Sequence, residues 1–221
     1  KENLDAIKVA DVTDTNRLVM KWRGETIVDM SRAFLDTNGV RQHQVVDVCE
    51  NEYDEHPFDA VKSDLNTVLQ DANVASQIGL AEMFDASIGK STVLMPFGGK
   101  YQLTPEEGSV QKLPVHGMTN TCSVMTYGYD PKVSKYSPYL GASYSVVEAL
   151  ARITALGADY KKCRLSNQEY FERLGADAQK WGQPFEALLG LIDAQLAFET
   201  PSIGGKDSMS GTYKDIHVPP T

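Results

Sequence analysis

The most polar stretch of the sequence, "PSIGGKDSMSGTY" at residues 201–213, contains the residue types that bind phosphate and metal ions. Adjacent glycines let a backbone approach a ligand closely, and a lysine offers a point charge to phosphate. An aspartate offers a hard oxygen to Mg²⁺, and serines offer hydroxyl groups. These residues are Gly204, Gly205, Lys206, Asp207, Ser208 and Ser210. The stretch predicts a loop that either binds phosphate or is simply a polar surface turn.

Two glycine–lysine pairs imitate the P-loop of nucleotide-binding proteins, which needs a further glycine upstream so that backbone N–H groups surround the phosphates. Phe84 and Asp85 stand in the upstream region of Lys90, and Pro201 stands in that of Lys206. Asp207 also replaces the Ser or Thr that would bind magnesium after the lysine. Neither pair therefore predicts a P-loop NTPase.

Glu148 and Arg152 lie four residues apart in a segment of helical pattern, a spacing typical of a solvated ion pair. A metal-ligand role for Glu148 is the alternative. The histidines lack a partner pattern for a catalytic dyad or a metal, so we expect structural or surface roles for His43, His56, His116 and His217. The cysteines have no CxxC spacing and are expected to be free thiols in a reducing cytoplasm: Cys49, Cys122 and Cys163.

The composition indicates a soluble globular protein, because 42% of its 221 residues are hydrophobic and 23% are charged. A formal net charge of −9 argues against a broad nucleic-acid surface, although one local loop can still hold a small phosphorylated ligand. No run reaches the roughly 18 apolar residues of a membrane span. The first residue, Lys1, and the final "HVPPT" are interpreted as cuts within a longer polypeptide.

The elements that position these residues alternate between strands and helices. Strands are predicted for residues 4–13 and for a hairpin that turns at Arg23-Gly24, followed by a short helix at 31–36. The polar, acidic residues 38–57 indicate a linker. Helices are expected at 60–71, 76–84, 138–156 and 185–198, and strands in "STVLMPFGG", "CSVMTYGY" and "KKCRLSNQEYF". The fold class is α/β, in the sense of mixed α+β.

Two of these helices have apolar stripes that predict their buried faces. Ser137 and Pro138 are suited to begin the helix at 138–156, and Gly157 is suited to follow its end. Its expected stripe is Val146, Val147, Leu150 and Ile153. The stripe expected for the helix at 185–198 is Phe185, Leu188, Leu189, Ile192 and Leu196.

Several segments together resemble phosphoribosylformylglycinamidine synthase of the long, clostridial type. They are "NVASQIGLAEMFDASIGKSTVLMPFGGKYQLTPEEG", "TNTCSVMTYGYDP", "SPYLGASYSVVEALARI", "QEYFERLGADAQKWGQPFEALLGL" and, most specifically, "IGGKDSMSG". The resemblance implies that residues 1–36 are the closing strands of an AIR-synthase C-terminal-like domain and that 37–65 are a linker. Residues 66–221 would then be the second AIR-synthase N-terminal-like domain, a mixed sheet packed with helices.

The resemblance also implies an activity: ATP-dependent conversion of formylglycinamide ribonucleotide to the amidine, with Mg²⁺ and glutamine-derived ammonia, in purine synthesis. It assigns ATP contacts to Gly204, Gly205 and Lys206, a substrate contact to Ser208, and metal binding to Asp207 and Glu148. Shorter family members have Asn where this chain has Lys206. At the auxiliary nucleotide site of large members, this chain has Thr121 and Arg152 in place of Asp and Asn. No catalytic residue is expected within these 221 residues.

The implied partners are the other domains of the same polypeptide, because two N-terminal-type domains pair through their sheets in this family. Without that partner domain, we expect the chain to pair with a second copy of itself. The expected pairing surface contains Val93, Met95, Val124 and Tyr127. One rival interpretation is a different enzyme of the AIR-synthase superfamily. Another is a non-catalytic scaffold that supports its pseudo-symmetric partner.

Overall fold

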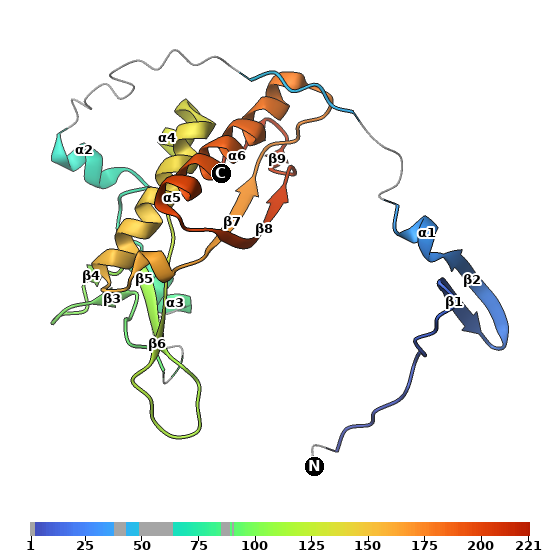
Figure 1. The fold of residues 1–221 in the computed structure, drawn as a ribbon. Coiled ribbons are helices and arrows are strands. Elements are labelled where there is room, and N and C mark those ends of the chain that lie inside the picture. Colours follow the sequence, from blue (N-terminus) through green and yellow to red (C-terminus); the bar gives the residue numbers. More distant parts are fainter. Residues whose placement is uncertain (1–2, 38–42, 49–63, 85–88, 90) are drawn as a thin grey trace. The chain divides into compact units, whose positions relative to one another are not determined.

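The computed structural model describes residues 3–37, 43–48, 64–84, 89 and 91–221 of the chain. They belong to two compact units, Lys1–Gln44 and Val45–Thr221 (Figure 1). Mixed helices and strands confirm the predicted fold class. Among the described residues, no helix has the length and apolar character needed to cross a membrane.

The first unit contains a β-hairpin, β1 (Arg17–Trp22) and β2 (Glu25–Ser31), followed by helix α1 (Arg32–Leu35). Arg23 and Gly24 both have positive φ, of 51° and 87°, which is the geometry of a tight two-residue turn. The hairpin and α1 are therefore confirmed. The predicted strand at 4–13 is wrong, because no described segment offers its backbone a neighbouring strand.

The second unit begins with two short helices and two antiparallel strand pairs. Helices α2 (Leu65–Gln70) and α3 (Ile78–Phe84) are followed by β3 (Phe97–Gly98), β4 (Thr104–Pro105), β5 (Gly108–Lys112) and β6 (Cys122–Thr126). The helix predicted at 60–71 is confirmed from residue 65, and its first residues lie outside the described part. The strand predicted in "CSVMTYGY" is β6, and it pairs with β5.

The strand predicted at 91–99 is divided between two partners. Val93 donates its N–H to the carbonyl of Val110 on β5 at 2.8 Å, whereas β3 pairs with β4. Pro96 separates the two parts, and proline has no N–H to continue a ladder. The continuous strand is therefore wrong, although both parts contact strands.

Three helices, a 3₁₀ turn and two strand pairs form the rest of the described part of the second unit. Helix α4 (Pro131–Tyr136) leads into α5 (Pro138–Ala155), the 3₁₀ turn η1 (Tyr160–Lys162) and β7 (Leu165–Tyr170). Helix α6 (Ala178–Phe198) is followed by β8 (Ser202–Ser208), β9 (Thr212–Tyr213) and β10 (Ile216–His217). Figure 1 shows α5 and α6 side by side, with β7 and β8 next to them.

Helix α5 follows its prediction closely. The Ser137 hydroxyl accepts a hydrogen bond from the Leu140 N–H at 3.2 Å, Pro138 is the first helical residue, and Gly157 has a φ of 85° after the end. Val146, Leu150 and Ile153 are buried, as predicted. Val147 is 41% exposed, so it does not belong to the buried stripe.

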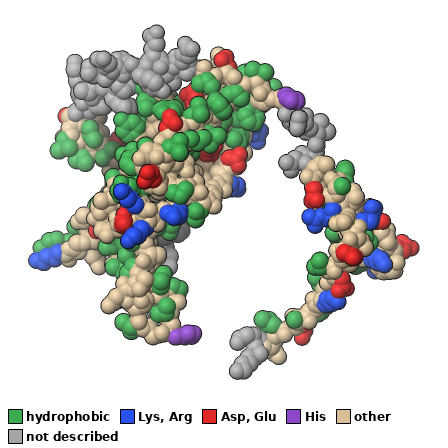
Figure 2. All heavy atoms as spheres, viewed as in Figure 1, with side chains coloured by type: hydrophobic (Ala, Val, Ile, Leu, Met, Phe, Trp, Pro, Cys, Tyr) green, Lys and Arg blue, Asp and Glu red, His purple; other side chains and the backbone are tan. Residues whose placement is uncertain are grey.

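Helix α6 begins seven residues earlier than predicted and buries the opposite face. Its predicted stripe is exposed, and its buried residues are mostly small: Gly182, Pro184, Glu186, Ala187, Gly190, Leu191 and Ala194. A Cβ at Gly190 would stand 2.1 Å from the Tyr139 carbonyl oxygen, so small residues allow α5 and α6 to approach closely. Hydrophobic side chains consequently remain on the surface over α6 (Figure 2).

The core of the second unit lies where α5, α6 and β7 meet. One cluster joins Val146 and Leu150 of α5 to Leu191 and Ala194 of α6. A second cluster contains Phe171, which is completely buried, with Leu174 and Ala187. Phe171 directly follows β7, so the core fixes the end of the strand that lies beside β8.

Candidate functional site

The predicted polar loop forms strand β8, so the expectation of a loop at residues 201–213 is wrong for most of its length. β8 pairs in parallel with β7, and Gly205 lies opposite Asn167. A Cβ at Gly205 would stand 2.1 Å from the Asn167 carbonyl oxygen, whereas a Cβ at Gly204 would meet nothing within 4 Å. Gly205 is therefore needed for close approach of the two strands, and Gly204 is not.

Strand alternation divides the predicted site residues between the two faces of the β7–β8 pair. Register partners share a face, so Asp207 lies on the same face as Glu169 of β7. This face forms a hollow of about 350 Å³ with Leu188, Leu191 and Gln195 of α6. By the same alternation, Ser208 belongs to the other face, opposite Tyr170, whereas Lys206, the register partner of Gln168, also lines this hollow beside Asp207.

Glu169 and Asp207 bring two carboxyl groups together at adjacent strands. Burial raises the pKa of the Glu169 carboxyl above its ordinary value, and the negative charge of Asp207 raises it further. One or two carboxylates plus water suffice for Mg²⁺, so this pair has the donor chemistry for that ion. In the described part of the chain, no three His, Cys, Asp or Glu side chains gather as a metal site.

The turn that follows β8 is fixed by the core. Phe171 donates its N–H to the Ser208 carbonyl at 2.9 Å, and Gly211 donates to the Phe171 carbonyl at 2.8 Å. The hydroxyl oxygens of Ser208 and Ser210 lie 2.9 Å apart. The backbone of Ser208 is thus held by a fully buried residue, and its hydroxyl has a neighbour of the same kind.

Glu148 has contacts that do not fit a metal ligand. Its Oε2 accepts the Tyr129 N–H at 2.8 Å, and its Oε1 lies 2.9 Å from Nη2 of Arg152. Arg152 also contacts the Glu107 carboxylate at 3.0 Å and donates to the Tyr127 carbonyl at 2.6 Å. Both carboxylate oxygens of Glu148 are therefore engaged, and a guanidinium already supplies the positive charge that a Mg²⁺ ion would bring.

The structure does not bring the other auxiliary-site residue to Glu148. Thr121 precedes β6, whereas the Tyr129 amide that binds Glu148 follows the end of that strand. Within the described residues, neither Thr121 nor Glu148 has a hydrogen bond to β8. The predicted ion pair between Glu148 and Arg152 is confirmed, and a magnesium site at Glu148 is not supported by its surroundings.

The remaining candidate residues either make contacts of a structural kind or lie outside the residues that the structure describes. Nδ1 of His217 lies 3.2 Å from Oε2 of Glu172, which Lys180 also contacts at 2.6 Å. This agrees with the structural role expected for His217. Cys122 and Cys163 are free thiols. Lys90, His56 and Cys49 lie outside the described residues.

Sequence reasoning missed Asn167 and Glu169, the β7 partners of the site. Both lie in "KKCRLSNQEYF", which was predicted to contain a strand, and they alternate with the more exposed Ser166 and Gln168. Polar residues at alternate positions of a predicted strand could have identified Asn167 and Glu169 as residues that share one face. The parallel pairing with β8, which joins segments on either side of α6, could not be derived from local pattern.

The proteins that are similar to the chain in sequence and in structure carry one name. No family model matches the chain. The chain is 27% identical over 215 residues to the phosphoribosylformylglycinamidine synthase subunit PurL of Pyrobaculum calidifontis, covering 96% of this chain and 29% of the relative. It is 26% identical over 227 residues to the PurL of Parafrankia sp., covering 98% and 28%. The chain thus spans less than a third of the length of these relatives.

Solved structures show the same likeness at the level of the fold. PurLQS from Thermotoga maritima has a TM-score of 0.67 at 15% identity, over 94% of this chain and 30% of the other. T. maritima PurL complexed with ATP has a TM-score of 0.65, also at 15% identity, over 95% and 30%. In sequence and in fold, the chain is therefore similar, over nearly its whole length, to part of the PurL subunit of phosphoribosylformylglycinamidine synthase.

Proposed function

We propose that the chain is part of a phosphoribosylformylglycinamidine synthase, which makes the amidine from formylglycinamide ribonucleotide with ATP and glutamine-derived ammonia in purine biosynthesis. The observation that carries the proposal is the similarity to PurL subunits over 96% or more of the chain. Structures of T. maritima PurL complexed with ATP and with FGAR, which share this fold, support ATP and this substrate as ligands.

The reaction suits a site built mainly from positioning groups. An amide oxygen is a poor leaving group, so phosphoryl transfer from ATP to that oxygen lets ammonia displace phosphate. The protein must align the reactants and neutralise the charge that develops. In this proposal Lys206, with Gly204 and Gly205, contacts ATP, and Ser208 contacts the substrate.

The metal assignment follows the geometry of the β7–β8 pair. Mg²⁺ would supply charge neutralisation for the ATP phosphates, and Asp207 together with Glu169 would hold it in the hollow that Gly205 and Lys206 also line. Glu148 is not part of this proposed Mg²⁺ site, because Arg152 and the Tyr129 amide occupy its carboxylate oxygens.

The organisation of the polypeptide follows from the same proposal. Residues 1–36 would close a preceding AIR-synthase C-terminal-like domain, 37–65 would be the linker, and 66–221 the second N-terminal-like domain. The other domains of the polypeptide would complete the reaction, with a glutaminase supplying ammonia, in the cytoplasm. A chain that spans about 29% of its relatives is expected to be inactive alone.

We also propose that the exposed face of β6 is a pairing surface, used by a partner domain or by a second copy of the chain. Met125 and Tyr127 are 70% and 61% exposed on this face. Val93 is exposed as well, but the bridge of Thr92 to Gln111 places Thr92 rather than Val93 on this face. Val124, one of the predicted surface residues, points toward α5 instead, because strand side chains alternate. Light scattering of the 221-residue chain at micromolar concentration tests self-pairing: a dimer is expected, and a monomer mass would contradict use of this surface by a second copy.

The function is tested by purifying a polypeptide of PurL length that carries this sequence. Formylglycinamide ribonucleotide, ATP and ammonia should give the amidine with equimolar ADP and phosphate, whereas the 221-residue chain alone should give none. Turnover by the 221-residue chain would contradict the proposed division of the site. Absence of amidine formation by the long polypeptide, with ATP hydrolysis on another substrate, would instead favour a different enzyme of the superfamily.

A scaffold role is the second candidate, and the Arg152 network favours it. The cluster of Arg152, Glu148 and Glu107 stabilises the helix–strand contact with protein groups alone. A domain whose only task is support would tolerate changes at Asp207 and Ser208 without loss of turnover.

A further inference from the structure

One largely buried carboxylate joins three separate segments of the second unit. Glu172, two residues after the end of β7, has a side chain that is 14% exposed. Its Oε2 lies 2.6 Å from Nζ of Lys180 in the first turn of α6 and 3.2 Å from Nδ1 of His217 on β10. A charge with so little access to water depends on its partners, because leaving it unpaired is costly. Glu172 therefore ties β10 and the start of α6 to the end of β7.

His217 also contacts the strand with which it pairs. It is the register partner of Thr212 on β9, and its Nδ1 lies 3.1 Å from the Thr212 hydroxyl. That hydroxyl accepts the N–H of Arg173, the residue after Glu172, at 2.9 Å. The side chain of Glu172 and the backbone of Arg173 thus hold both strands of the β9–β10 hairpin.

The β9–β10 hairpin is continuous with the turn at residues 209–211, which follows β8. Gly211 donates its N–H to the Phe171 carbonyl at 2.8 Å, and Val218 donates to the Gly211 carbonyl at 2.9 Å. A Cβ at Gly211 would clash with the Val218 side chain, so the hairpin closes tightly on this end of the turn. Met209 packs against the buried cluster of Phe171. The position of the hairpin therefore fixes the end of the turn.

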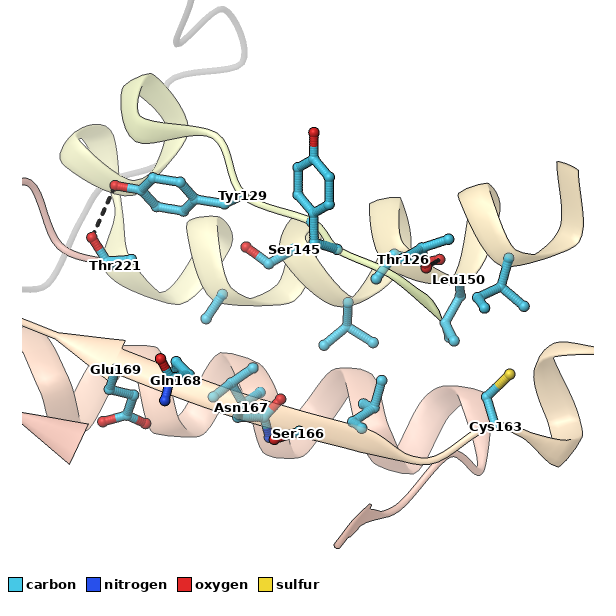
Figure 3. Close-up of a pocket in the computed structure, with 18 of the residues that line it drawn as sticks. Thr126, Tyr129, Ser145, Leu150, Cys163, Ser166, Asn167, Gln168, Glu169 and Thr221 are labelled. Carbon is cyan, nitrogen blue, oxygen red and sulfur yellow. Dashed lines mark hydrogen bonds between the residues drawn. The ribbon is translucent and has the colours of Figure 1, made fainter. Parts of the chain in front are cut away.

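The segment after β10 is anchored as well. Tyr170 donates its N–H to the Thr221 carbonyl at 3.0 Å. The Thr221 hydroxyl lies 3.1 Å from the hydroxyl of Tyr129, the contact drawn in Figure 3. His217 comes between Gly211 and Thr221 in the chain, and both of these are held by the backbone at the end of β7. The contact of His217 with Glu172 adds a side-chain anchor between the two backbone anchors.

The turn includes a neighbour of the hydroxyl that the proposed function assigns to the substrate. The hydroxyl oxygens of Ser208 and Ser210 lie 2.9 Å apart. The backbone of Ser208 is held directly, because its carbonyl accepts the Phe171 N–H at 2.9 Å. Ser210 is held instead through Gly211 and the hairpin. Glu172 thus acts on the side of the turn from which Ser210 meets the Ser208 hydroxyl.

We propose that Glu172 is a positioning residue: through His217 it holds the β9–β10 hairpin, and the hairpin fixes the turn that directs the Ser208 hydroxyl to the substrate. The inference rests on the proposed function, which assigns the substrate contact to Ser208. The proposed ATP contacts at residues 204–206 lie upstream on β8. Loss of the Glu172–His217 contact therefore affects use of the substrate and leaves use of ATP unchanged.

Steady-state kinetics of the PurL-length polypeptide separate this role from a general effect on stability. Glu172→Gln removes the charge, and His217→Leu removes the imidazole at a position whose side chain is 46% exposed, where the fold tolerates replacement. In both variants kcat/KM for formylglycinamide ribonucleotide should fall about tenfold, because small misplacements of a positioning group are costly. The KM for ATP should stay within about twofold of wild type.

Lys180→Gln is the matched control, because it removes the other partner of the same carboxylate oxygen and keeps the Glu172–His217 contact. Its kcat/KM for formylglycinamide ribonucleotide should stay within about twofold of wild type. The Glu172→Gln/His217→Leu double variant should lose no more than either single variant, as expected for two residues that act as one unit. Equal losses for ATP and substrate, or a loss in Lys180→Gln as large as in His217→Leu, would overturn the proposal.

Hydrogen exchange tests the same role without turnover. The Gly211 amide should exchange at least about tenfold faster in Glu172→Gln and His217→Leu than in wild type, whereas the amide of the buried Leu150 in α5 should be unchanged. An unchanged rate at Gly211 in both variants would overturn the proposal. If the wild-type polypeptide forms no amidine, the proposed function fails, and exchange at Gly211 still decides whether Glu172 fixes the turn.

Discussion

Glu169 on β7 and Asp207 on β8 are register partners in a parallel strand pair, so their carboxyl groups lie on one face next to α6. Burial and the Asp207 charge both raise the pKa of Glu169. A carboxyl whose pKa is higher in the folded than in the unfolded state destabilises the fold when it is ionised. The ordinary pKa of 4.5 marks the lower limit of this effect, because the carboxyl is protonated in both states below it.

Glu169→Gln should therefore raise the Tm of the chain at pH 7, where the wild-type carboxylate is ionised. The gain should shrink as the pH falls through the raised pKa of the folded state and should vanish below the unfolded value. Thermal melts at several pH values check this. Glu82→Gln, at an exposed position of α3, is the matched control and should change the Tm little at any pH. A Glu169→Gln variant that is less stable than wild type at pH 7 would contradict the stated electrostatics.

Two neighbouring glycines should respond differently to alanine. Gly205→Ala places a Cβ against the Asn167 carbonyl oxygen and should cost about 1–3 kcal/mol of stability, as for other overpacked sites. Gly204→Ala meets open space and should be neutral or should stabilise by about 0.5–1 kcal/mol, because alanine restricts the unfolded chain. Urea denaturation measures both. Equal losses from the two variants would show that the β7–β8 approach is not as close as described.

Arg152 should stabilise the contact between α5 and the segment that follows β6. Its side chain is 17% exposed and contacts Glu148, Glu107 and the Tyr127 carbonyl. Arg152→Met keeps most of the volume but leaves Glu148 without its counter-charge, so a loss of about 1–3 kcal/mol is expected in urea denaturation. Lys162→Met is the control, because its ion pair with Asp159 is exposed and should contribute little. Equal effects of the two changes would mean that the Arg152 network is no stronger than a surface pair.

Local sequence signals predicted the elements whose ends carry strong caps or turns. Ser137 with Pro138, and Arg23 with Gly24, located α5 and the hairpin because capping and positive φ depend on residues close in sequence. The buried face of α6 was mispredicted, since close packing on α5 selected Gly190 and Ala194 rather than the large apolar residues. Periodicity finds a hydrophobic stripe but does not say whether another helix covers it.

In the candidate site, too, local sequence predicted the residue types but not their tertiary contacts. The residue types at 204–208 were recognised from sequence, but strand pairing decides which of them share a face. Glu169 became a partner of Asp207 only through a parallel pairing that joins segments on either side of α6. Likewise, Glu148 could be identified as a possible ligand from its spacing, whereas its engagement by the Tyr129 amide depends on tertiary structure.

The most direct test of the proposed role of β8 is turnover in a PurL-length polypeptide that carries Asp207→Asn or Ser208→Ala, with Asp215→Asn in the exposed turn between β9 and β10 as the control. If β8 positions the metal and substrate, ATP- and ammonia-dependent amidine formation should fall by about 100-fold in each site variant. The Tm should stay within about 2 °C of wild type, because Asp207 is exposed and Ser208→Ala removes only a half-buried hydroxyl. Unchanged turnover in both site variants, or a loss of turnover that only follows unfolding, would contradict it.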